Sequence, residues 1–172
     1  MARLPRGTAL DRLFRREPEA VEPAGEPPLE PMRVYTREIE VSGHVRPTEE
    51  RITDLLQRGD ELPFLPEGAD PADPESWMSL APKSVLLVVP PPHVSAPEKR
   101  LHRQTQEVIV RVGPYLVAGT AHLRPGFEQD LFLRATQPFL PLTHAVVSSE
   151  AGDVGHEVVI VNLGEVEELR EV

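Results

Sequence analysis

Proline interrupts this chain more often than long helices or a large parallel sheet allow. The 172 residues include 20 prolines and 11 glycines, whereas proline makes up about 5% of an average protein. A proline inside a helix removes a hydrogen bond and clashes with the preceding turn, and in a central strand it removes a bond of the ladder. We therefore expect short elements, and the stretches rich in valine and isoleucine are typical of strands.

Four short motifs occur twice in the chain, in the same order. They are a glycine, a His-x-Arg-Pro motif, an Asp-Leu pair, and the run Pro-Phe-Leu-Pro. The copies lie 75 to 78 residues apart, at Gly43 and Gly119, 44–47 and 122–125, 54–55 and 130–131, and 63–66 and 138–141. A shared order at a nearly constant offset predicts an internal duplication. The alternative is two unrelated segments with a similar use of proline.

The duplication predicts a mainly β protein made of two tandem small barrels or rolls, SH3-like or Sm-like, each with one short helix. We place the first repeat at 33–92, with a proline- and aspartate-rich insertion at 66–83. A linker at 93–106 then leads to the second repeat at 107–172. If the last strand of one repeat pairs with the other repeat, the two instead share a single unit.

Local patterns predict the elements within each repeat. The strands, which are rich in β-branched residues and bounded by turn-forming residues, are expected at 84–89, 108–112, 115–123 and 157–162. A short helix is expected over 48–58, with Thr48 as its N-cap and Gly59 as its end. The matching stretch of the second repeat, 126–135, is expected to form a helical turn.

Charge is concentrated at the two ends of the chain. The net charge is −10, but residues 33–149 carry only −3, while 17–32 carry −5 and 150–172 carry −6. Residues 1–16 hold five arginines and one aspartate and so carry +4. A surface that follows a phosphate backbone is normally positive, so this acidic chain is not expected to bind nucleic acid.

Residues 1–32 are predicted to form an arm outside the core, with a short amphipathic helix. The residues that would form its two faces are Leu10, Leu13 and Phe14 on the apolar side and Arg12, Arg15 and Arg16 on the basic side. So short a helix folds only when it docks, and the proline- and glutamate-rich residues 17–31 favour an extended tether. We interpret the arm as a docking segment for a protein partner. A disordered tail and weak binding to a membrane surface are the alternatives.

Two histidine–arginine pairs are candidates for anion binding. His44 and Arg46 would share one face of a strand, as would His122 and Arg124. A pseudo-twofold arrangement would bring both pairs to one anion or acidic segment, whereas the alternative is that each pair points outward at a strand end. Trp77, the only tryptophan, either packs the insertion onto the core or is an exposed contact for a partner.

Composition and spacing give little support to a catalytic or metal site. The chain has no cysteine, its six histidines are scattered, and neither a Gly-x-Ser-x-Gly motif nor a phosphate-binding glycine motif occurs. A hydrolase would have to be built from His144, Ser148, Ser149 and Asp153, which are near one another in sequence. We therefore predict no enzyme activity, no cofactor and no metal ion.

The second half resembles an uncharacterised family of small bacterial β domains. The similarity extends from Tyr115 to Val147, with a fainter match over 33–66. It rests on Asp130-Leu131 followed by the strand Phe139-Leu140-Pro141-Leu142-Thr143. The resemblance implies a fold and no particular activity.

More distantly, the layout is similar to the Sm-like small barrel, in which an Asp–Asn pair and a later Arg-Gly pair form an RNA pocket. Asp54 and Asp130 match the acid, and 162–164 loosely matches the later motif. Arginine stands at 58 and 134 where the family has asparagine, and this departure counts against RNA binding.

Together these features predict a non-catalytic adaptor or structural subunit that binds a protein partner through its arm and its β surfaces. A homo-oligomer is compatible with this prediction. A nucleic-acid or anionic-ligand binding module is the second hypothesis, and a hydrolase is the third. With no membrane-spanning stretch and no secretory signal in the sequence, a cytoplasmic location is expected. Two lysines against 16 arginines suggest a bacterial source with a GC-rich genome.

Overall fold

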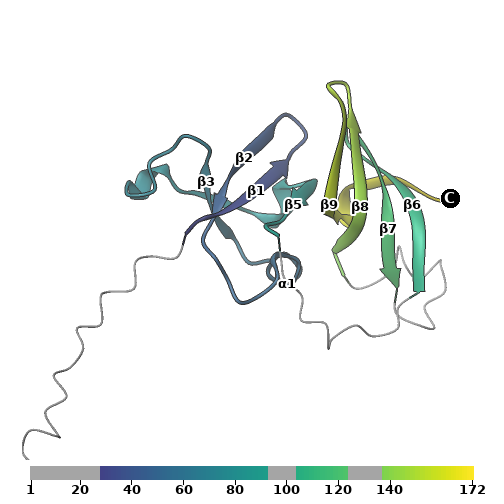
Figure 1. The fold of residues 1–172 in the computed structure, drawn as a ribbon, viewed down its shortest axis with the longest axis horizontal. Helices are drawn as coiled ribbons and strands as arrows, with labels where there is room; N and C mark the ends of the chain where they lie inside the picture. The colour runs from purple at the N-terminus through teal and green to yellow at the C-terminus, as the bar shows by residue number, and fades with distance from the viewer. Residues whose placement is uncertain (1–27, 93–103, 124–136) are drawn as a thin grey trace, which may run out of the picture.

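Ten antiparallel strands and one α-helix, α1 (Ile52–Arg58), make up the fold that the computed structural model describes over residues 28–92, 104–123 and 137–172 (Figure 1). The strands are β1 (Glu30–Tyr35), β2 (Glu40–Val45), β3 (Leu62–Pro66), β4 (Met78–Leu80), β5 (Leu87–Val89), β6 (Gln104–Val112), β7 (Tyr115–Leu123), β8 (Phe139–Ser149), β9 (Gly152–Asn162) and β10 (Val166–Glu171). The prediction of a mainly β protein is confirmed.

All ten strands belong to one sheet, in the order β10-β6-β7-β8-β9-β5-β1-β2-β3-β4. The first five strands have the order β5-β1-β2-β3-β4, and the last five repeat it as β10-β6-β7-β8-β9. A 3₁₀ helix precedes the last strand of each set, η3 (Pro82–Ser84) before β5 and η5 (Leu163–Glu165) before β10. We call β1 to β5 with α1 the first half, and β6 to β10 the second half.

The sheet is open and continuous, where the sequence predicted two closed barrels. β5 pairs with β9, so that Leu87 lies opposite Val161 and Val88 lies opposite Ile160. In the strand order, β10 and not β9 is the counterpart of β5. The two halves are therefore one shared unit, which was the alternative to separate barrels.

Two hydrophobic cores lie on opposite faces of the sheet at this junction. Neighbouring residues of a strand point to opposite faces. Accordingly, Leu87 and Val161 belong to the second-half core, while Val88 and Ile160 belong to the first-half core. Tyr35 of β1 also packs into the second-half core. Because β5 is buried on both faces, its sequence is apolar throughout and does not alternate.

The helix of the first half begins later than predicted. α1 starts at Ile52, and its N-cap residue, Arg51, makes no side-chain capping bond. The hydroxyl of Thr48 instead accepts a hydrogen bond from the backbone N–H of Glu50 (3.2 Å), which closes a local turn ahead of the helix. Gly59 ends the helix as predicted, because its φ of 80° lies in the left-handed region that favours glycine.

Residues 66–83 were predicted as an insertion, but they supply the fourth strand of the first half. β4 pairs with β3 at the edge of the sheet. The loop before it closes on itself, because the side chain of Asp73 accepts a hydrogen bond from the backbone N–H of Glu75 (3.0 Å) and the indole N–H of Trp77 donates to the carbonyl of Pro71 (3.2 Å). In strand order, β4 corresponds to β9 of the second half.

Candidate functional site: the cleft between the two halves

A cleft of about 1000 Å³ lies where the two halves meet. One wall comes from β1, β2 and α1 of the first half, and the other comes from β8 and β9 of the second half. Its apolar lining includes Met32, Ile52, Phe139, Leu140 and Val158. Binding sites are commonly concave, with apolar walls and a few well-placed polar groups, so this cleft is the candidate site.

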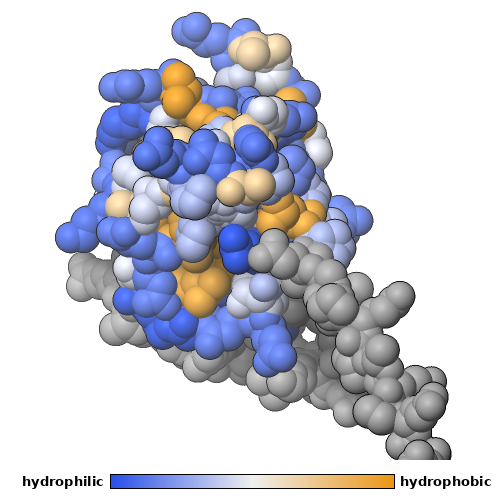
Figure 2. Space-filling view, turned by 90° about the vertical axis from the view of Figure 1, so that its left-hand side faces the viewer, coloured by the Kyte–Doolittle hydropathy of each residue, from blue (hydrophilic) through white to orange (hydrophobic). Residues whose placement is uncertain are grey.

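Exposed apolar side chains are spread over the rest of the surface. Figure 2 faces the left-hand side of Figure 1, where the first half lies, and shows hydrophobic areas separated by hydrophilic side chains. Ile39, at the turn between β1 and β2, is 58% exposed, and Met78 of β4 is 53% exposed. Single exposed apolar residues of this kind are normal on protein surfaces and need no partner.

A polar cluster around Tyr35 and His156 links β1 to β9 at the cleft. The Tyr35 hydroxyl lies 3.2 Å from Nε2 of His156, and the ring of Tyr35 meets that of Tyr115 edge-on, with 5.2 Å between the ring centres. Arg33, which lines the cleft, forms an ion pair with Glu40 (3.0 Å). The cluster therefore joins side chains of the first half to two strands of the second half.

Burial changes the acid–base behaviour of this cluster. Burial lowers the pKa of His156 below its usual 6.5, and the positive charge of Arg33 lowers it further, because both disfavour the imidazolium ion. Glu40 opposes this shift to a smaller extent. Burial also raises the pKa of Tyr35 above its usual 10.0, although its hydrogen bond with Arg33 works against the rise. At neutral pH a neutral imidazole therefore meets a protonated phenol.

We expect the free energy of unfolding to fall as the pH falls through 6.5, the ordinary pKa of histidine. Just below that pH His156 becomes protonated in the unfolded chain but stays neutral in the folded protein. The unfolded state therefore binds more protons, and acidification favours it. Above pH 6.5 His156 is neutral in both the folded and the unfolded chain, so this loss of stability is absent. Urea unfolding between about pH 8 and pH 5 measures the effect.

The matched variant for this prediction is His156→Gln, which keeps a polar partner for the Tyr35 hydroxyl but does not titrate. Its free energy of unfolding should depend less on pH over the same window. If the natural protein and the variant lose stability in parallel on acidification, His156 is not the responsible group.

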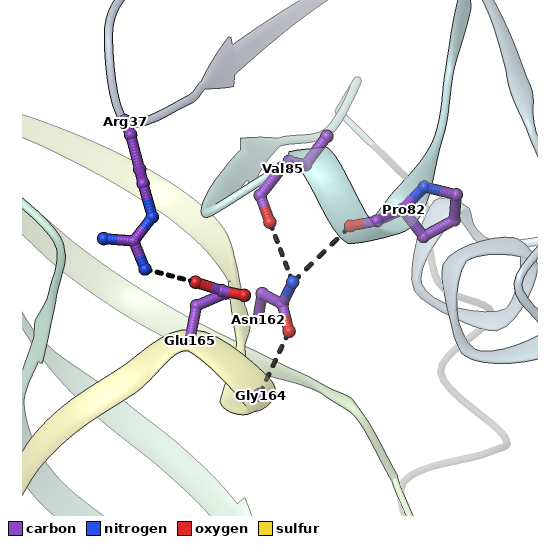
Figure 3. A network of polar contacts seen from close by, with 6 residues as sticks. All are labelled: Arg37, Pro82, Val85, Asn162, Gly164 and Glu165. Atoms are coloured by element: carbon purple, nitrogen blue, oxygen red, sulfur yellow. Dashed lines mark hydrogen bonds and ion pairs between the residues drawn. The ribbon is translucent and has the colours of Figure 1, made fainter.

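A buried asparagine joins the two halves at a second point (Figure 3). The side-chain amide of Asn162 donates to the carbonyls of Val85 (2.9 Å) and Pro82 (3.5 Å) in the first half. Its oxygen accepts a hydrogen bond from the backbone N–H of Gly164 (3.0 Å) in η5. An ion pair between Arg37, in the turn after β1, and Glu165 of η5 lies beside it. These contacts hold the two walls of the cleft in one arrangement.

The structure brings together part of the predicted anion site. His44 of β2 and His122 of β7 both line the cleft, and Nε2 of His122 lies 2.8 Å from the Thr143 hydroxyl. Arg46 does not join them: it follows the end of β2, where strand alternation no longer applies, and its guanidinium lies 4.9 Å from the centre of the Trp77 ring. Arg124 is outside the described residues.

Trp77 packs within the first half, between the carbonyl of Pro71 and the guanidinium of Arg46. This arrangement agrees with the packing alternative for Trp77, and its side chain is half-buried. The remaining predicted docking residues, Leu10, Leu13, Phe14, Arg12, Arg15 and Arg16, lie outside the described residues, as does the helical turn predicted at 126–135.

Three residues that shape the site were missed in the search for functional residues: Tyr35, His156 and Asn162. Asn162 entered only through the Sm-like comparison, although it carries a signal of its own. It is the only asparagine of the chain and directly follows four apolar residues of a strand, so its amide had to find partners in the core. Tyr35 and His156 are 121 residues apart, and no local pattern connects them.

The residues weighed for hydrolysis lie in the hairpin of β8 and β9. Ser148 pairs with Asp153 across the hairpin and Ser149 pairs with Gly152, while His144 is exposed and has a φ of 50°. Among the residues that the structure describes, no three histidine, aspartate or glutamate side chains are grouped so that they could hold a metal ion. The chemistry that the described geometry offers best is binding in the cleft.

No family model, curated protein sequence or solved structure matches this chain. The resemblances to small bacterial β domains and to Sm-like barrels therefore stay predictions. In the described part of the chain, no helix has the length and apolar character needed to cross a membrane.

Proposed function

We propose that the protein is a non-catalytic adaptor or structural subunit that holds a protein partner in the cleft between its halves. The supporting observation is the cleft itself, about 1000 Å³ in volume and lined by both halves. A protein segment placed there would contact apolar side chains of both walls and polar groups at the rim, which is the usual composition of a binding interface. The arm was predicted to extend to residue 32, but β1 begins at Glu30 and Met32 is buried in the first-half core. The part of the arm that precedes β1 would provide the second contact.

We also propose that the two halves arose by duplication of one small five-stranded roll. Their identical strand orders and their matching 3₁₀ helices support this. The repeated glycines, Gly43 and Gly119, lie in the matching strands β2 and β7. The phenylalanines of the two Pro-Phe-Leu-Pro runs, Phe64 and Phe139, are buried in β3 and β8. Fusion of the two rolls through β5 and β9 would have created the cleft.

Binding of nucleic acid or another anion is the weaker proposal. The charged lining of the cleft contains five carboxylates but only the two guanidinium groups of Arg33 and Arg51. A phosphate would therefore meet net negative charge at neutral pH. A cytoplasmic location, a bacterial source and self-association are compatible with the adaptor role and remain predictions.

Val158→Arg tests the adaptor proposal, because Val158 lines the cleft from β9 and is only partly buried. An arginine there places a large charged side chain against the apolar wall, so we expect recovery of bound proteins from a lysate of the native source to fall about tenfold, the effect of 1.4 kcal/mol. The measurement is affinity purification followed by quantitative mass spectrometry.

The control is Val154→Arg, which makes the same change on the same strand at a side chain that is 43% exposed and does not line the cleft. It should recover the same proteins as the natural chain. Urea unfolding of both variants establishes that each is folded. If both variants recover the same partners in the same amounts, the cleft is not the binding surface.

A further inference from the structure

The lining of the cleft carries more negative than positive charge. Its carboxylates are Glu30, Glu50, Asp54, Glu67 and Glu157. Four of them, Glu30, Asp54, Glu67 and Glu157, form no salt bridge with a described residue. Of the two arginines in the lining, Arg33 is already engaged in an ion pair. Together with the apolar walls, this charge favours an occupant that combines apolar and cationic side chains.

We propose that the chain's own segment 3–16 occupies the cleft when no partner is bound. The segment lies outside the described residues, and its sequence combines five arginines and a single aspartate with the apolar Leu10, Leu13 and Phe14. Its charge of +4 is opposite in sign to that of the cleft lining. This inference rests on the proposed function, because it takes the cleft as the binding surface.

The connection of the chain favours this occupant over a free peptide. The described chain begins at Pro28 and reaches the cleft lining at Glu30, so the segment is attached beside the site. Residues 17–27 reach at most about 40 Å when fully extended. A tether of this length gives an effective concentration on the order of 1 mM. A weak contact therefore suffices to keep the cleft occupied.

If segment 3–16 occupies the cleft, it competes with the partner for the same site. A partner has to displace the segment, so it has to offer a similar combination of basic and apolar side chains with higher affinity. The arm then becomes available for the second contact only after the partner has entered the cleft. The partner chemistry that follows is a basic, amphipathic protein segment.

The absence of cysteine allows this contact to be tested by disulfide cross-linking in the full-length chain. Leu13→Cys is combined with Thr53→Cys, which lies in the cleft lining on α1. The control combines Leu13→Cys with Ala151→Cys, at the exposed turn between β8 and β9. Under mild oxidation we expect the first pair to form an intramolecular disulfide about tenfold faster than the control pair, and high salt to reduce the difference.

Charge reversal provides the specificity test. Glu30→Arg with Glu157→Arg, added to the Leu13→Cys/Thr53→Cys chain, should slow the cross-link about tenfold by replacing attraction with repulsion. Adding Arg12→Glu and Arg15→Glu should then restore much of the rate. Recovery in the doubly reversed chain shows that the partners are these charges and that the chain is still folded.

Three outcomes overturn the inference: equal rates for the two cysteine pairs, rates unaffected by charge reversal, and cross-links formed only between two chains, which would assign the cleft to the arm of a second copy. Failure of this inference can be distinguished from failure of the proposed function. If the arm does not cross-link but Val158→Arg still loses its partners, only self-occupation is wrong. If Val158→Arg also keeps its partners, both proposals are wrong.

Discussion

Gly43→Ala is expected to destabilise the protein by about 3 kcal/mol or more, because the added methyl group has no room. Gly43 is buried in β2 opposite Pro66 of β3. A Cβ atom there would lie 2.3 Å from the carbonyl oxygen of Leu65 and 2.5 Å from the ring of Phe64. The carbonyl belongs to the backbone of β3 and Phe64 is only 1% exposed, so the strand itself has to shift.

Alanine variants of two other strand glycines provide the comparison for this prediction, with the free energy of unfolding measured in urea. At Gly155 of β9 an added Cβ meets nothing within 4 Å, so Gly155→Ala should be neutral or stabilise slightly. At Gly119, the counterpart of Gly43 in the proposed duplication, it lies 3.1 Å from the Cβ atoms of Leu142 and Ala145, and Gly119→Ala should cost about 1 kcal/mol. An equal unfolding midpoint for Gly43→Ala and Gly155→Ala would contradict the packing argument.

Asn162→Ala is expected to cost about 2–4 kcal/mol, because it leaves buried polar groups without partners. The carbonyls of Pro82 and Val85 lose the donor of the side-chain amide, and the N–H of Gly164 loses its acceptor. The methyl group of alanine can neither donate a hydrogen bond to these carbonyls nor accept one from this N–H. The thermal midpoint and the urea midpoint should both fall, and the two halves should become more mobile relative to each other.

The comparison for this prediction is Gln57→Ala. Gln57 of α1 also bridges the halves, by one hydrogen bond from its amide to the carbonyl of Phe139 (3.2 Å), but it is only partly buried. Its loss should therefore cost no more than about 1 kcal/mol. If Asn162→Ala is no more destabilising than Gln57→Ala, Asn162 does not have the structural role that its burial indicates.

The elements that were predicted well are those with a local physical cause. Gly59 ends α1 because the chain there needs a positive φ. Isoleucine and valine residues marked the strands, and β6 and β7 meet at the turn-forming residues Gly113 and Pro114, which separated the strands expected at 108–112 and 115–123. The start of α1 was misjudged because Thr48 had two uses for its hydroxyl, a helix cap or an isolated turn, and the structure has the turn.

The candidate site was predicted only in part, because its residues come together through contacts between distant parts of the chain. His44 and His122 were singled out as one of two possible arrangements, and both line the cleft. Their partner Arg46 was misplaced because β2 ends one residue earlier, at Val45. The sequence around His156 contains no pattern that predicts its contact with Tyr35.

The sequence by itself determined that this protein is built from short strands in two similar series, because proline, glycine and β-branched residues act on the backbone around them. Only the tertiary structure decided which edges of the two series meet. Edge pairing joins residues such as Val88 and Ile160, and its free energy depends on burying both faces of the paired strands at once. That single pairing places Tyr35 beside His156, buries Asn162 and opens the cleft between the halves.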